Sequence, residues 1–217
     1  MNKLNKIALG TVLSFAAVSA HAYSYNFKTM ADGSYGESAW TTLNLSGGLS
    51  ITATSSSGGT GYAYLDSGNA GLGVCGGLYN PTLANTKYPG SKANLCNPSS
   101  DDNVDVKGET LHLTFMYDTK IDDITFNDNH DADYSLYMNH IMIGGVNYQF
   151  TTNLGQKVDY SAGSWDVAAG TTLEIAYVDE EFYLSTMTFH NVPEPATLGL
   201  LGLGLLGLGY SAKRRKQ

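Results

Sequence analysis

The sequence predicts an all-β protein, an antiparallel β-sandwich of the jelly-roll type with an apolar segment at either end. Three observations predict it. Apolar and polar residues alternate with a period of two through the middle of the chain. Glycine, asparagine, aspartate and proline, which favour turns, separate these short runs. No long stretch between the two ends keeps the 3.6-residue period of a helix.

Strands are predicted wherever this alternation is clear. The run after residue 110 is the best example, because its alternate residues fall on one face, namely Leu111, Leu113, Phe115 and Tyr117. Gly144-Gly145 predicts a two-residue hairpin, and 179–181 predicts another tight turn. The predicted strands cover residues 49–53, 62–65, 111–117, 121–126, 134–143, 146–150, 173–178 and 182–189.

Residues 1–22 have the features of a secretory signal peptide. Lys3 and Lys6 form a basic start, residues 7–18 form a short apolar run, and small side chains at Ala20 and Ala22 mark a cleavage site. The apolar run is too short for a permanent membrane span. We therefore expect export, cleavage by signal peptidase after Ala22, and a mature domain at residues 23–191.

Residues 192–217 contain a stiff motif, an apolar stretch and a basic end. The motif Pro193-Glu194-Pro195 is extended, because proline fixes its own φ and disfavours helix at the residue before it. Residues 196–210 carry no charge and predict a short transmembrane helix. The basic residues that follow predict a cytoplasmic end, and they are Lys213, Arg214, Arg215 and Lys216.

These three parts, in this order, resemble the PEP-CTERM sorting signal. The resemblance implies processing at Pro193, Glu194 and Pro195 by exosortase, a membrane enzyme of Gram-negative bacteria that make exopolysaccharide. It implies a protein held briefly in the inner membrane and then delivered to the cell envelope, the cell surface or the extracellular matrix. Residues 71–75, the acidic stretch after residue 100 and residues 108–115 also resemble a recurring pattern of PEP-CTERM proteins.

The charge of the chain limits its partners. The formal net charge is −8 at pH 7, and the predicted domain contains no arginine, the side chain that grips phosphate in a bidentate fork. A net negative domain without arginine is a poor candidate for binding nucleic acid. Neutral glycans, cations and other proteins remain as partners.

Two cysteines, Cys75 and Cys96, lie in the predicted domain. An even number of cysteines in an exported protein predicts a disulfide. The alternative is a pair of free thiols that bind metal or perform redox chemistry, although the chain has no C-x-x-C motif.

Two loops rich in aspartate and asparagine are candidate calcium sites, because hard cations prefer many oxygen ligands. The candidate ligands are Asp101, Asn103 and Asp105 in the first loop, and Asp128, Asp131 and Asp133 in the second. The first loop starts like an EF-hand loop but does not follow its pattern, because Val106 stands at the glycine position. Aspartate and asparagine also favour solvated turns, because they hydrogen-bond their own backbone, and this reading stays open.

Aromatic residues suggest a further kind of site. Trp40, Tyr62, Tyr64 and Trp165 could stack on sugar rings if they share one exposed surface. Tyrosine also suits a half-buried sheet face, with its ring in the core and its hydroxyl in water.

No catalytic residue is predicted. The chain lacks a G-x-S-x-G motif and an H-E-x-x-H motif, and nothing selects one pair of carboxylates for glycoside hydrolysis. The sequence favours a non-catalytic surface or matrix protein associated with exopolysaccharide and biofilm. The alternatives are a secreted glycan-binding module, with or without calcium, and a hydrolase acting on polysaccharide.

Overall fold

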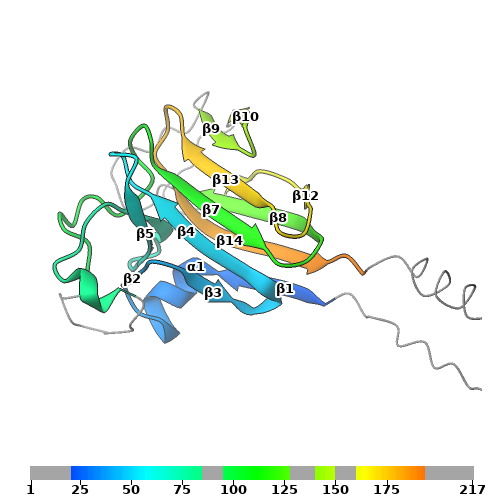
Figure 1. The fold of residues 1–217 in the computed structure, drawn as a ribbon, viewed down its shortest axis with the longest axis horizontal. Coiled ribbons are helices and arrows are strands. Elements are labelled where there is room, and N and C mark those ends of the chain that lie inside the picture. Colours follow the sequence, from blue (N-terminus) through cyan, green and yellow to red (C-terminus); the bar gives the residue numbers. More distant parts are fainter. Residues whose placement is uncertain (1–20, 85–94, 128–139, 150–159, 194–217) are drawn as a thin grey trace, which may run out of the picture. The chain divides into compact units, whose positions relative to one another are not determined.

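The computed structural model describes residues 21–84, 95–127, 140–149 and 160–193. All of them except Pro193 belong to one compact unit, residues 20–192. The unit is mainly antiparallel β (Figure 1), with a short helix, α1 (Phe27–Thr29), that continues into a wider turn, Met30–Ser34. Single turns of 3-10 helix lie at Ser46–Gly48 and Pro81–Leu83.

The described residues form fourteen strands. They are β1 (Ala22–Asn26), β2 (Ser38–Trp40), β3 (Leu43–Leu45), β4 (Leu49–Thr54), β5 (Thr60–Asp66), β6 (Gly71–Cys75), β7 (Thr110–Phe115), β8 (Thr119–Asn127), β9 (His140–Ile143), β10 (Val146–Gln149), β11 (Tyr160–Ser161), β12 (Trp165–Val167), β13 (Thr172–Tyr177) and β14 (Tyr183–Asn191).

The strands form one continuous sheet that curls on itself like half a barrel (Figure 1). Its strand order is β10-β9-β13-β7-β4-β5-β6-β14-β8-β11, and β1, β2, β3 and β12 pair at its sides. The two halves are joined through β4 and β5, where Ala53 faces Gly61 and Thr54 faces Thr60. The predicted all-β antiparallel class is confirmed. The predicted sandwich of the jelly-roll type, which would need two stacked sheets, is not confirmed.

The core lies on the concave side of the curled sheet. Alternate residues of β4 and β7 are buried there, as the period of two predicts. Phe189 on β14 is fully buried and its ring centroid lies 5.2 Å from that of Tyr23 and 5.3 Å from that of Phe115. Burial of these alternate apolar side chains is the main source of stability of the unit.

The two predicted hairpins have different outcomes. Gly144 and Gly145 do join β9 to β10, and both have positive φ, 58° and 80°, as this turn requires. The hairpin predicted at 179–181 is wrong. β13 pairs with β7 and β9, whereas β14 pairs with β1, β6 and β8, so this connection crosses between the two halves of the sheet.

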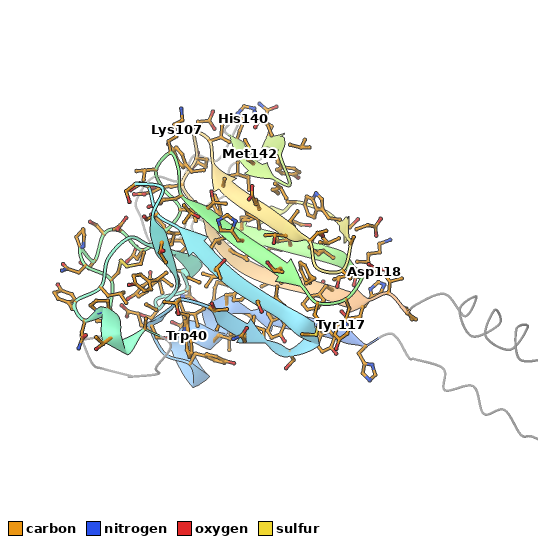
Figure 2. The ribbon with its side chains drawn as sticks, in the orientation of Figure 1. Trp40, Lys107, Tyr117, Asp118, His140 and Met142 are labelled. Carbon is orange, nitrogen blue, oxygen red and sulfur yellow. A yellow bond between two sulfur atoms is a disulfide. The ribbon has the colours of Figure 1, made fainter. Side chains whose placement is uncertain are left out.

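Both ends of the compact unit lie at the same strand pair. Ala22, the first residue of β1, faces His190 near the end of β14. After β14 the main-chain N–H of Val192 donates to the carbonyl of Asp118 at 2.7 Å, beside the labelled Tyr117 (Figure 2). The two segments predicted as signals therefore join the domain at adjacent positions.

The predicted membrane segment, residues 196–210, lies outside the described residues. No helix among the described residues is long and apolar enough to span a bilayer. Residues 1–20 and 194–217 lie outside the described residues, and so do Ala20, Glu194, Pro195 and the basic cluster at 213–216.

A disulfide joins Cys75 at the end of β6 to Cys96, with 5.7 Å between the two Cα atoms and a sequence separation of 21. Both cysteines are buried against Ala39 and Tyr64 in a small cluster separate from the main core. The covalent link holds Cys96 against the end of β6.

We expect replacement of both Cys75 and Cys96 by alanine to lower the free energy of unfolding by about 3 kcal/mol, because the unfolded chain regains the entropy of an open loop. Urea denaturation of the wild type and of the double variant measures the difference. Reduction of the wild type with dithiothreitol should give a similar loss. An unchanged midpoint in both experiments would contradict the prediction.

Candidate functional site

The acidic segment at residues 101–105 is held like an additional strand. The main-chain N–H of Val74 on β6 donates to the carbonyl of Asn103 at 3.1 Å. On the other side Val104 exchanges two main-chain hydrogen bonds with Phe182, of 3.0 and 3.2 Å. Because the segment is hydrogen-bonded on both edges, its backbone is held in place, and this fixes where its side chains begin.

Gly73 is what allows this close approach. A Cβ atom at Gly73 would lie 2.1 Å from the carbonyl oxygen of Asp102 and 2.7 Å from the Cα of Asn103. Both contacts are to backbone, which cannot rotate away as a side chain would. The glycine-rich run at 71–75 and the acidic stretch after residue 100, two parts of the pattern noted in the sequence, thus pack directly against each other.

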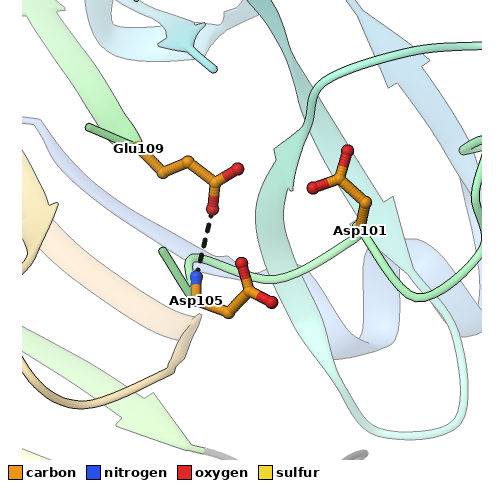
Figure 3. A group of neighbouring side chains, drawn as sticks. All are labelled: Asp101, Asp105 and Glu109. Carbon is orange, nitrogen blue, oxygen red and sulfur yellow. Dashed lines mark hydrogen bonds between the residues drawn. The ribbon is translucent and has the colours of Figure 1, made fainter. Parts of the chain in front are cut away.

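Three carboxylates meet where the acidic segment reaches the start of β7 (Figure 3). One oxygen each from Asp101, Asp105 and Glu109 lies within 4.8 Å of the others. Glu109 is the residue just before β7. It lies in a turn in which its N–H donates to the carbonyl of Val106 at 3.1 Å. The N–H of Tyr177 on β13 donates to the Glu109 carbonyl at 3.3 Å. We call Asp101, Asp105 and Glu109 the acidic site.

Glu109 is the most constrained member of the acidic site. The residue is 0% exposed, and its Oε2 accepts a hydrogen bond of 3.1 Å from the main-chain N–H of Asp105. Its Oε1 is buried and accepts no hydrogen bond from the residues that the structure describes. Burial raises the pKa of Glu109 to about 8, against the opposing effect of the Asp105 N–H, and the negative charges of Asp105 and Asp101 add to the rise.

Asp101 links the acidic site to the disulfide. Its Oδ2 accepts a hydrogen bond of 3.0 Å from the N–H of Gly76, the residue after Cys75. Asp101 is half-buried, as is Asp105. An ion held by these carboxylates would therefore be linked through Asp101 to Gly76, next to the disulfide, and through Glu109 to the beginning of β7.

The structure brings together two of the residues predicted to bind calcium, Asp101 and Asp105. The Nδ2 of Asn103, which lies between them in sequence, donates to Oε2 of Glu181 at 3.5 Å. Asp128, Asp131 and Asp133 lie outside the described residues.

Sequence reasoning missed Glu109. It stands in no dense acidic run, and the only signal was its position immediately before a strongly alternating strand, where a charged residue enters a buried environment.

The four aromatic residues predicted to stack on sugars do not share one exposed surface. Trp40 (labelled in Figure 2) and Trp165 are partly buried against the main core. Tyr62 and Tyr64 pack in the separate cluster around the disulfide. Tyr64 is 1% exposed, so its ring has no face for a ligand. Its hydroxyl donates to Oε1 of Glu37 at 2.7 Å, and burial raises its pKa. Sugar stacking on Trp40, Tyr62 or Trp165 singly stays a prediction.

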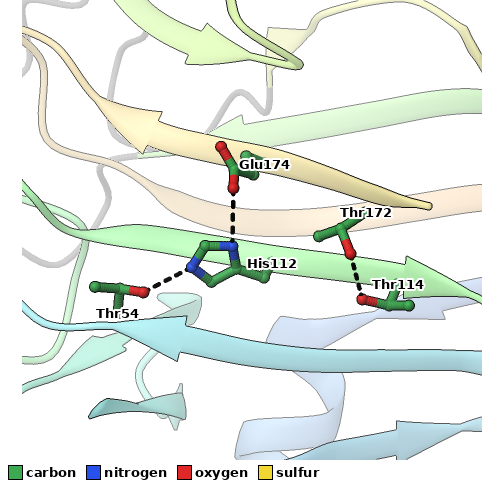
Figure 4. Close-up of polar contacts among 5 residues, drawn as sticks. All are labelled: Thr54, His112, Thr114, Thr172 and Glu174. Atoms are coloured by element: carbon green, nitrogen blue, oxygen red, sulfur yellow. Dashed lines mark hydrogen bonds and ion pairs between the residues drawn. The ribbon is translucent and has the colours of Figure 1, made fainter. Parts of the chain in front are cut away.

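A second polar feature covers the outer face of β4, β7 and β13 (Figure 4). His112 is hydrogen-bonded through Nε2 to the Thr54 hydroxyl at 2.7 Å, and its Nδ1 lies 3.4 Å from Oε1 of Glu174. One rung further along, the hydroxyls of Thr114 and Thr172 are 2.7 Å apart. These five residues form a polar array on a sheet face that is at least partly exposed.

Comparison with known proteins identifies the end of the chain. The model of the PEP-CTERM protein-sorting motif matches residues 191–216. No curated protein and no solved structure matches the chain. The match starts at the last residue of β14 and includes Pro193, which is exposed.

Proposed function

We propose that this protein, which carries a PEP-CTERM sorting motif, is a non-catalytic component of the cell surface or extracellular matrix that acts in the exopolysaccharide layer of a Gram-negative bacterium. The motif indicates an exported bacterial protein that exosortase processes. The motif is the single observation that carries the proposal, because a sorting signal indicates the location to which the protein is delivered.

The position of the motif supports delivery of a folded domain. β14 ends at Asn191, the first residue of the matched motif. Cleavage near residues 193–195 would therefore remove the tail without cutting a strand. The last anchored contact of the domain is the hydrogen bond from Val192 to Asp118. Release by exosortase would leave the sheet complete.

The chemistry of the domain suits an extracellular setting. The Cys75–Cys96 disulfide is stable in an oxidising compartment. The pI is about 4.9, and the chain has no arginine outside the tail. Both features disfavour binding to anionic partners and are compatible with a hydrated polysaccharide matrix. The acidic site also favours an ion over a polymer substrate, because the fully buried Glu109 is out of reach of a glycan chain.

The proposal is tested by deleting the gene in strains with and without the exopolysaccharide locus. With the locus present, we expect the protein in the matrix fraction and a weaker biofilm after deletion of the gene. Without the locus, the protein should move to the medium and its deletion should have no further effect. The same fractionation and the same phenotype in both backgrounds would contradict the proposal.

A second candidate function is glycan binding, and the polar array of Figure 4 is the observation that favours it. Hydroxyl, imidazole and carboxylate groups on an exposed sheet face can hydrogen-bond sugar hydroxyls. Retardation of the purified protein in gels containing the isolated exopolysaccharide would support this function, with His112→Ala reducing the retardation. New reducing ends in the same mixture would instead indicate a hydrolase and contradict a non-catalytic role.

A further inference from the structure

We propose that Asp101, Asp105 and Glu109 form a calcium site that ties the disulfide-linked segment to the start of β7. This goes beyond the proposed function, which requires no metal. Two observations carry it: the convergence of three carboxylates (Figure 3), and the buried oxygen of Glu109 that accepts no hydrogen bond from the described residues.

The spacing of the carboxylates suits a single calcium ion. Calcium binds oxygen at about 2.3–2.6 Å, so two ligands on opposite sides of the ion are about 4.6–5.2 Å apart. The three oxygens lie within 4.8 Å of one another, which is close enough for one ion to contact all three. All three donors are hard oxygen ligands, which favours calcium or magnesium over zinc or copper.

The buried side chain of Glu109 suits a cation ligand. A buried polar atom normally has a partner. The Asp105 N–H satisfies Oε2 only, and Oε1 accepts no hydrogen bond from the described residues. A divalent cation held by the three carboxylates would contact Oε1 and supply that partner.

The surrounding structure fixes the ligands before an ion arrives. Asp101 is oriented by the Gly76 N–H, and Glu109 by the Asp105 N–H. Asp101 and Asp105 are only half-buried, so water can complete a calcium shell of six to eight oxygens from the open side. Such a site, with three carboxylates and several waters, belongs with the extracellular calcium modules whose Kd is about 0.1–1 mM.

The bound ion would act on the local fold. The segment at 101–105 is held by backbone hydrogen bonds to β6 and to Phe182, and Glu109 opens β7. Calcium would link these elements directly, because its ligands come from both ends of the 101–109 connection. Calcium is thus expected to stabilise the region between the disulfide and the central strands.

The test uses the mature protein purified from the medium and stripped of metal. Addition of 10 mM CaCl₂ should raise Tm by about 5 °C, because a ligand specific for the folded state stabilises it by mass action. The same concentration of MgCl₂ should have a smaller effect, since magnesium demands octahedral geometry and loses its water reluctantly. Choline chloride at matched ionic strength controls for screening, and isothermal titration calorimetry gives Kd.

Glu109→Gln is the decisive variant. We expect it to lose the calcium response and, without calcium, to melt at or above the Tm of metal-free wild type, because the amide removes a buried carboxylate. Asp101→Asn should weaken calcium binding at least tenfold, and its amide oxygen can still accept the Gly76 hydrogen bond, so this variant tests the site if Glu109→Gln does not fold.

Two control variants leave the three carboxylates of the acidic site unchanged. Asp166→Asn removes an exposed carboxylate from β12. The triple variant Asp128→Asn, Asp131→Asn and Asp133→Asn removes the carboxylates of the other predicted calcium loop. Both should keep the full calcium response. A response that survives in Glu109→Gln and in Asp101→Asn, or that disappears only in the triple variant, would overturn the proposal.

Discussion

Replacement of Gly73 by alanine is expected to lower the free energy of unfolding by about 3 kcal/mol, the upper end of the usual cost of overpacking. The added methyl group would stand 2.1 Å from the Asp102 carbonyl oxygen. Because neither backbone can rotate away, the acidic segment must separate from β6 and lose the hydrogen bond from Val74 to Asn103. The midpoint of urea denaturation measures the loss.

Gly59→Ala is the matched control for this change. A Cβ atom at Gly59 would have its nearest contact at 3.4 Å, with the Ser57 hydroxyl, which is an ordinary separation. We expect its stability to stay within about 0.5 kcal/mol of the wild type. If the two alanine variants unfolded at the same urea concentration, the close packing of β6 against the acidic segment would be wrong.

The second large effect concerns processing. Replacement of Pro193, Glu194 and Pro195 by alanine should leave an uncut precursor in the membrane. Alanine favours helix where proline prevents it, so the following apolar run could extend through the site that exosortase needs in an extended, accessible form. An immunoblot of membrane and medium fractions, with antiserum against residues 23–191, measures the fraction released.

Val192→Ala is the control, because it changes an exposed side chain beside the motif and keeps the N–H that bonds to Asp118. It should be released like the wild type. Deletion of the exosortase gene should retain the wild type as fully as the triple alanine change does. Equal release of the triple variant and the wild type would show that the tail only anchors the protein.

The strands that sequence predicted well have one buried face. β4, β7 and β13 alternate clearly, and each was located to within two residues at either end. β6 was missed because all five of its residues are buried, so its sequence, Gly71 to Cys75, has no period of two. β1 was missed because it begins at Ala22, the last residue before the expected cleavage site, and has no fully buried residue.

The candidate site was predicted in part. Dense carboxylates at Asp101 and Asp105 could be found from composition, because local clustering is visible along the chain. Glu109 could not, since its role depends on a turn that brings it back beside Asp105 and on burial by strands distant in sequence. Likewise, nothing local distinguishes the buried Tyr64 from its partly exposed neighbour Tyr62.

The sequence by itself determined the β class, the pairing of the two cysteines and the sorting motif. Each depends on residues close together in the chain, or on a count of two that allows one pairing. Tertiary structure alone decided that the strands form one curled sheet, that 179–181 crosses between its halves, and that Glu109 joins Asp101 and Asp105. The physical reason is that strand partners and burial arise from contacts between distant segments, which a local period of two does not specify.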